Sequence, residues 1–216
     1  LCAAHASRSD RDSPPGLLKR ARTHSIKANC RDTVESSAGH DNSGGEALTC
    51  SITRSTMTII ANQYKDNSKY LNATNTDGAC AGRDKPRYIG GAGVYSSVAY
   101  DWGGFDTVGG YNGYMDPNTY QAGDINTAAS ESCSRGVDCA GFVSRVWGLS
   151  SYHNCPMLNY PHVSCGLYST TYLRQGDVMN NPNKHVVWFD TTAANGIYDY
   201  ESTTDSSYDR VVRIFS

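Results

Sequence analysis

The C-terminal end of the chain restricts the fold more than any other part of the sequence. Three segments rich in β-branched and aromatic residues follow one another there: HVVWFD (185–190), NGIYDYES (195–202) and RVVRIF (210–215). Such segments are typical of β-strands. Asn195-Gly196 is a strong signal for a tight turn between antiparallel strands, and Pro182-Asn183 predicts a turn before the first strand. We therefore expect an antiparallel sheet containing a hairpin.

Two earlier segments have the spacing of amphipathic helices. In SITRSTMTIIANQY (51–64), the residues Met57, Ile60, Ala61 and Tyr64 fall on one helical face. Ser51, Thr53 or Ser55 is the candidate cap of this helix. In GVDCAGFVSRVWGL (136–149), the apolar face consists of Phe142, Val143, Val146 and Trp147, and Gly148 offers a stop.

The region between these helices, from Lys65 to about Ile125, is dense in Gly, Asn, Asp and Tyr. This composition favours turns over long helices. Residues 1–46 are polar, contain SPPG at 13–16, and have little apolar periodicity, so they are interpreted as a disordered tail, linker or propeptide. Lys19-Arg20 is either a processing site or a solvated basic patch. The sequence thus predicts a tail at 1–46 and one α+β domain at 47–216.

Composition favours a secreted protein. The 216 residues include eight cysteines and the sequon Asn72-Ala73-Thr74, and the opening LCAAHA resembles the end of a signal peptide. The net charge of −2 gives no reason to expect a nucleic acid partner. No apolar run approaches the length that spans a bilayer. We expect a secreted monomer that neither binds nucleic acid nor spans a membrane.

Several cysteine pairings are compatible with the sequence. Loss of Cys2 with a signal peptide would leave an odd number of cysteines and hence one unpaired thiol. Candidate bridges are Cys50–Cys80, Cys30–Cys133, Cys155–Cys165 and Cys133–Cys139. The segment HNCPMLNYPHVSC also holds His153, Cys155, His162 and Cys165, which together form a possible zinc set, but their spacing matches no common zinc finger.

Cys139 is the candidate nucleophile because it stands where the second helix should begin. The unpaired N–H groups at a helix start favour negative charge, and they can also hold an oxyanion. His185, which opens the first strand of the hairpin, is the candidate base. Asp199 and Glu201 share one face of the next strand, and either can approach the imidazole. Glu201 is the preferred third residue and Asp199 the alternative. The competing interpretation makes Cys139 half of a disulfide.

Three motifs resemble those of the NlpC-type cell-wall peptidases, a family of papain-like cysteine peptidases. DCAGFVSRVWG (138–148) is similar to the family's nucleophile motif Asp-Cys-Ser-Gly-Phe-Val. LRQGDV…KHVVWF (173–189) is similar to its Leu-x-x-Gly-Asp-Leu segment followed by the histidine strand. AYDWGG (99–104) matches its Tyr-x-Trp-Gly-Gly segment. The motifs occur in the family's order across about residues 50–205.

This resemblance implies a papain-like fold, in which a nucleophile helix packs on an antiparallel sheet. It makes Cys139 the nucleophile, His185 the base and Glu201 the third polar residue, with no metal or cofactor. It also implies a substrate-binding role for Tyr100, Asp138 and Trp102, although Trp102, like Trp147, is equally suited to the core. In some members the tyrosine, the acid and a serine bind a free amino terminus. Ala140 stands in place of that serine and removes one hydrogen bond.

A second departure is the glycine- and tyrosine-rich insert at 105–137, which we expect beside the substrate groove. The expected substrate is peptidoglycan or a peptide, with the γ-D-glutamyl bond to a diamino acid as the family's usual target. The same residues would also serve an N-acetylmuramoyl-L-alanine amidase or another acyl-transfer enzyme. An inert, disulfide-stabilised binding module is the alternative of a different class.

Overall fold

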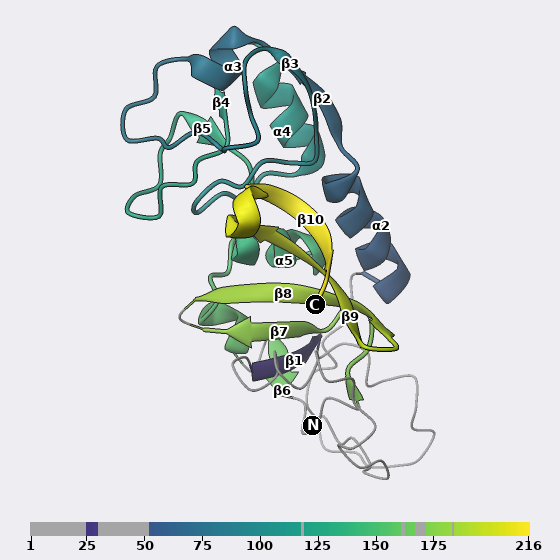
Figure 1. The fold of residues 1–216 in the computed structure, drawn as a ribbon. Coiled ribbons are helices and arrows are strands. Elements are labelled where there is room, and N and C mark those ends of the chain that lie inside the picture. The colour runs from purple at the N-terminus through teal and green to yellow at the C-terminus, as the bar shows by residue number, and fades with distance from the viewer. Residues whose placement is uncertain (1–24, 30–51, 118, 161–162, 167–171, 183) are drawn as a thin grey trace.

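The computed structural model describes residues 25–29, 52–117, 119–160, 163–166, 172–182 and 184–216. It is an α+β structure built on a six-stranded antiparallel sheet. The strand order is β10 (Arg210–Phe215), β9 (Gly196–Thr203), β8 (His185–Ala193), β7 (Val178–Asn181), β1 (Ser25–Asn29) and β6 (Ser164–Gly166). Figure 1 shows this sheet across the lower half of the molecule.

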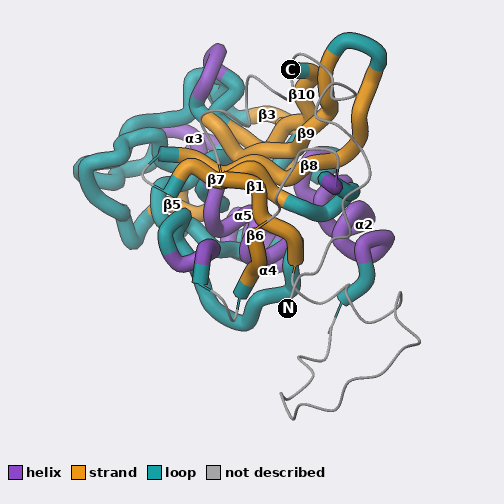
Figure 2. The backbone as a smooth tube through the Cα atoms, turned by 90° about the horizontal axis from the view of Figure 1, so that it is seen from below, coloured by secondary structure: helices purple, strands orange, loops and turns teal. Residues whose placement is uncertain are grey.

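The three predicted C-terminal strands are confirmed as β8, β9 and β10, with the β8–β9 turn at Ala194 and Asn195. The strand β7 was not predicted, and it pairs with β8 through Val178↔Trp188. Strand β1 lies inside the segment interpreted as a tail. Its backbone pairs with β7 on one side and β6 on the other (Figure 2). The boundary placed at residue 47 lies outside the described residues.

Both predicted helices are confirmed. Helix α2 (Arg54–Lys65) begins at the cap Thr53, whose hydroxyl accepts from the Thr56 N–H at 3.2 Å, and it buries Met57, Ala61 and Tyr64. Helix α5 (Cys139–Val146) buries the expected apolar face. The two helices meet where the Tyr64 and Phe142 rings pack edge to face, 5.6 Å apart.

Both faces of the sheet carry buried apolar side chains. On the face of α2 and α5, the sheet residues Val178, Val186, Trp188, Tyr200 and Val211 join the main core. Met179, Val187, Phe189 and Ile197 form a smaller cluster of their own, with Leu173 packed against it. Because both faces are apolar, the sequence of β8 is a continuous apolar run and not an alternating one.

Residues 66–137 form a separate group of small elements, the upper lobe (Figure 1). It contains β2 (Ser68–Leu71), α3 (Ala73–Asp77), β3 (Gly93–Ser96), α4 (Val108–Met115), β4 (Gln121–Ala122) and β5 (Ser134–Arg135). Two further 3-10 turns, η3 (Met157–Asn159) and η5 (Asp205–Ser207), lie outside it. The region predicted as loops therefore contains short helices and strands.

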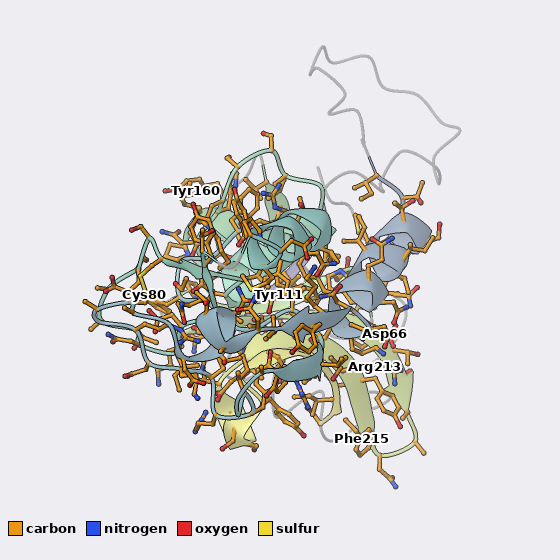
Figure 3. The ribbon with its side chains drawn as sticks, turned by 90° about the horizontal axis from the view of Figure 1, so that it is seen from above. Asp66, Cys80, Tyr111, Tyr160, Arg213 and Phe215 are labelled. Carbon is orange, nitrogen blue, oxygen red and sulfur yellow. A yellow bond between two sulfur atoms is a disulfide. The ribbon has the colours of Figure 1, made fainter. Side chains whose placement is uncertain are left out.

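The upper lobe is held by polar contacts and a disulfide as well as by apolar packing. Arg83 donates to the carbonyls of Gly123 at 2.7 Å and Ala122 at 2.8 Å, and Cys80 is bonded to Cys133. Figure 3 shows Cys80 at the flank of the molecule and the buried Tyr111 near its centre. The insert at 105–137 is thus an integral part of this lobe. No helix in the described ranges is long and apolar enough to cross a membrane.

Candidate functional site

Asp138 fixes the start of α5, and Cys139 is the first residue of that helix. One Asp138 oxygen accepts from the Gly141 N–H at 2.6 Å. The other accepts from the Gly103 N–H at 3.0 Å and from the Tyr152 hydroxyl at 2.7 Å. The carboxylate is buried and satisfied by donors from three segments. Asp138 therefore acts here as the helix cap, and its oxygens face the protein's own donors.

A close backbone approach brings the Tyr-x-Trp-Gly-Gly segment against this helix start. A Cβ atom at Gly141 would lie 2.0 Å from the Gly104 carbonyl oxygen, so only glycine fits there. The same carbonyl accepts from the Asp138 N–H at 3.3 Å. At the other end of α5, the Trp147 indole N–H donates to the Gly176 carbonyl at 2.8 Å. Hydrogen bonds thus join the three motifs on which the resemblance rests.

His185 and Glu201 form the second part of the site. His185 is the first residue of β8, and its Nε2 is hydrogen bonded to the Glu201 carboxylate on β9. Glu201 is buried, whereas the His185 side chain keeps 26% of its surface exposed. A carboxylate that accepts from one ring nitrogen fixes the tautomer and orientation of the imidazole, as a catalytic base requires.

The structure brings Cys139 close to this imidazole, so that the thiol and the ring shift each other's pKa. Burial alone lowers the pKa of His185, but the hydrogen bonds with Cys139 and then Glu201 outweigh it and raise that pKa to about 10. Since Nε2 is engaged by Glu201, Nδ1 is the ring nitrogen left for the thiol. The three residues predicted as nucleophile, base and orienting group therefore lie in contact in that order.

Cys155 is a neighbour of the site that the sequence analysis did not assign. Its sulfur lies 3.9 Å from the Cys139 sulfur, and both thiols are free and buried. This contact, followed by burial, raises the pKa of Cys139, while the interactions with His185 lower it; the net direction is upward. The expected lowering by the helix start alone is thus overridden by the second thiol. No sequence signal indicated this pairing, because Cys155 belongs to a connector without regular periodicity.

The remaining predicted site residues, Tyr100, Trp102 and Asp199, differ in their burial and their neighbours. Tyr100 is buried next to it: burial, followed by the charges of Cys139 and Asp138, raises the pKa of the phenol, which stays neutral. Trp102 is half-buried and therefore not part of the core, unlike Trp147, which is. Asp199 is fully buried and pairs with Phe189 in the sheet, so Glu201, and not Asp199, is the acid at His185.

Tyr152 is a second residue that the sequence analysis missed. Besides donating its hydroxyl to Asp138, Tyr152 packs its ring edge to face on that of Phe105, with the ring centroids 6.2 Å apart. The Arg145 guanidinium lies over the Phe105 ring, 3.4 Å from its centroid. Phe105 opens the insert. This first residue of the insert thus reaches the site, while the remainder builds the upper lobe.

The cysteine pairings differ from those expected. Cys80 and Cys133 are bonded to each other, so the predicted bridges Cys50–Cys80, Cys30–Cys133 and Cys133–Cys139 are wrong. Cys155 is a free thiol, which also rules out Cys155–Cys165. Residues 2, 30 and 50 lie outside the described ranges. Within those ranges no cluster of His, Cys, Asp or Glu is arranged to hold a metal ion; His162 of the possible zinc set lies outside them.

Comparisons with known proteins return no relative: no family description, no curated protein and no solved structure matches this chain. The chemistry of the site is therefore argued from its geometry. A thiol at a helix start, followed by an imidazole and then a buried carboxylate, can serve as a nucleophile, a proton carrier and an orienting group, the three groups that acyl transfer through a thioester requires.

Proposed function

We propose that this protein is a cysteine hydrolase that cleaves amide bonds, with the papain-like arrangement of a nucleophile helix on an antiparallel sheet. The contact series Cys139–His185–Glu201 at the start of α5 carries this proposal. A disulfide half would need no imidazole beside it and no buried carboxylate behind that imidazole. The hydrogen bonds between the three motifs support the resemblance to NlpC-type peptidases as a second line of argument.

In this mechanism the Cys139 thiol gives its proton to His185, and the thiolate attacks the amide carbonyl carbon. The Cys139 N–H, one of the unpaired donors at the helix start, holds the oxyanion. The C–N bond then breaks as the His185 imidazolium protonates the leaving amine, which leaves a thioester on Cys139. His185 next takes a proton from water, and the hydroxide displaces the thiolate to release the acid. Glu201 stabilises the imidazolium in both halves.

The proposed substrate is a stem peptide of peptidoglycan, with cleavage at the γ-D-glutamyl bond to a diamino acid and action outside the cell. The motifs support this class. Asp138 restricts the choice of substrate further, since both of its carboxylate oxygens already accept hydrogen bonds from Gly103, Gly141 and Tyr152. A substrate's free amine would have to displace the Tyr152 hydroxyl, so we expect cleavage that does not require a free amino terminus.

The test is digestion of purified peptidoglycan by the full chain, with mass spectrometry of the released fragments. Product masses separate cleavage at the γ-D-glutamyl bond from cleavage at the N-acetylmuramoyl–L-alanine bond. Cys139→Ala should abolish digestion with an unchanged circular dichroism spectrum. Cys155→Ala is the matched control, because it removes the other buried thiol but not the one at His185, and it should retain turnover. Digestion by Cys139→Ala would refute the nucleophile.

Iodoacetamide labelling distinguishes the enzyme from an inert binding module. Peptide mapping after brief treatment should show Cys139 modified ahead of Cys155, because the interaction with His185 favours the thiolate form of Cys139. Equal, slow labelling of both thiols would favour the binding module.

A further inference from the structure

The hydrolytic mechanism uses one thiol, but the site holds two. The Cys139 and Cys155 sulfurs are 3.9 Å apart, and the Cys155 side chain occupies space beside the attacking atom. Both residues are almost fully buried, in the same core cluster. A second free thiol in contact with a nucleophilic one is a chemical feature in its own right, because the two can be joined by oxidation.

A hydrogen bond to its backbone carbonyl fixes the position of Cys155 beside Cys139. The Asn180 side-chain amide on β7 donates to the Cys155 carbonyl at 2.7 Å and to the Asn159 side-chain oxygen at 3.1 Å. Cys139 is fixed in turn by the first turn of α5, which Asp138 caps. The sulfurs need to approach by about 2 Å to reach bonding distance, which side-chain rotation achieves where the two Cα atoms lie within about 7 Å of each other.

Two other interpretations of the thiol pair explain less. A metal site would need further ligands, and the described residues contain no cluster arranged to hold a metal ion. Ordinary core packing would require both thiols to be chemically inert. Cys139 is not inert by its surroundings, because its interaction with His185 favours the thiolate, and His185 remains partly exposed at the same place. The pair therefore combines a thiol that interacts with an imidazole and a second thiol in contact with it.

We propose that Cys155 is a resolving thiol that converts Cys139 into a reversible disulfide and so switches the site off. The Cys139 thiolate attacks a hydroperoxide, which breaks the O–O bond and gives a sulfenic acid and, for hydrogen peroxide, water after protonation. The Cys155 thiol then displaces the sulfenic hydroxyl as a second water, forming the S–S bond. Two equivalents of an external thiol reverse the reaction and leave as their own disulfide. The inhibitory consequence rests on the proposed function; the disulfide itself does not.

The experiment treats the full chain with hydrogen peroxide and maps its peptides without reduction. Trypsin places Cys139 in the peptide 136–145, and Cys155 together with Cys165 in 146–174. Fragment ions between residues 155 and 165 identify the linked cysteine. We expect a Cys139–Cys155 link with a mass loss of about 2 Da, loss of peptidoglycan digestion, and recovery of both thiols and digestion with dithiothreitol.

The matched variant is Cys155→Ser, compared by the ratio of its digestion rates after and before treatment. Without a resolving thiol, Cys139 should proceed to sulfinic acid, so dithiothreitol should no longer restore digestion. In the wild-type chain, sulfinic acid on Cys139 with Cys155 still open to alkylation would overturn the proposal, as would a link from Cys139 to Cys165. If peptidoglycan is never digested, the mass map still decides the disulfide. If digestion occurs without the link, only the switch fails.

Discussion

At the scale of single residues, Asp101 is one group that should make the stability of the fold depend on pH. It lies in the Tyr-x-Trp-Gly-Gly segment, and burial, which outweighs a hydrogen bond from Ser134, raises its pKa to about 8. The neighbouring charges of Asp106, Asp124 and Asp138 act in the same direction. An unfolded aspartate has a pKa of about 4, so between about pH 4 and 8 the folded state binds the extra proton. Stability is therefore lost as the pH rises through this window.

Asp101→Asn should remove that loss. Because the amide does not ionise, the variant's melting temperature should fall less than that of the wild type between pH 5 and pH 9. Differential scanning calorimetry across this range provides the measurement, with the wild type scanned in the same buffers. A parallel decline in the two proteins would show that Asp101 is ionised throughout.

Glu201→Gln should move the alkaline limb of the pH–activity profile. Glu201 raises the pKa of His185 through its hydrogen bond and its charge, so its neutral replacement lowers that pKa from about 10. Under the proposed mechanism, the imidazolium that protonates the leaving amine is then lost at lower pH, and the decline in kcat/KM shifts toward neutral pH. The kcat/KM profile measures this shift.

Asp199→Asn is the control for that profile, since Asp199 is a buried acid on the same strand that faces Phe189 in the sheet. Its alkaline limb should coincide with that of the wild type. A shift of equal size in both variants would assign the effect to the net charge of the strand and not to the contact with His185.

The sequence was sufficient to predict Cys139, His185 and Glu201 as neighbours: hairpin geometry allows Glu201 to approach His185, and the resemblance to NlpC-type peptidases added Cys139 to them. It preferred Glu201 over Asp199 without a physical reason that separates them, and the structure supplies one in the pairing of Asp199 with Phe189. Cys155 and Tyr152 approach the site through the path of a connector. Their contacts depend on tertiary packing that no local spacing encodes.

At the scale of elements, the position of α5 depends on how closely its first turn meets the Gly103-Gly104 segment. Gly141→Ala places a methyl group against the Gly104 carbonyl oxygen, where the available distance is 2.0 Å. Backbone must move, and we expect a loss of about 1–3 kcal/mol or more in the free energy of unfolding. Urea unfolding measures the loss.

Ala140→Gly is a useful comparison for that variant, because it perturbs the same turn of α5 without adding an atom. Its cost should be the modest one of a glycine in a helix, about 1 kcal/mol, together with a small buried methyl group. If Gly141→Ala is no more destabilising than Ala140→Gly, the close approach is relaxed in solution.

The longer elements could be predicted from periodicity, and the shorter ones could not. Helices α2 and α5 each carry a repeated apolar pattern, and strands β8, β9 and β10 are rich in β-branched and aromatic residues. Strand β7, in contrast, spans only Val178–Asn181, and α4 has the sequence VGGYNGYM, in which three glycines oppose a helix by propensity. These elements exist because their surroundings pair or bury them. The α+β class was accessible from sequence, whereas the six-strand order was not.

At the scale of the whole molecule, a disulfide joins two distant positions of the upper lobe. Cys80 and Cys133 are separated by 53 positions, so their bond restricts a large loop of the unfolded chain. By restricting the entropy of the unfolded chain, such a bridge stabilises the folded state by about 4 kcal/mol. Cys80→Ser with Cys133→Ser should lower the free energy of unfolding by up to that amount in a urea titration.

The same double variant tests how far the upper lobe and the sheet are coupled. Arg87 forms an ion pair with the fully buried Asp209, and the Arg87 N–H also donates to that carboxylate, so the lobe is anchored to the chain just before β10. We expect one cooperative transition at lower urea, and not two. A separate early transition would show that the lobe unfolds by itself.

Strand β1 has a consequence for any shortened version of the protein. It lies between β7 and β6, and its hydrogen bonds complete the ladders on both. A chain that starts after residue 29 leaves β7 as an open edge next to the histidine strand and separates β6 from the sheet altogether. Open edges recruit strands from other molecules. Cleavage within this N-terminal region, if it released β1, would therefore promote self-association of the protein.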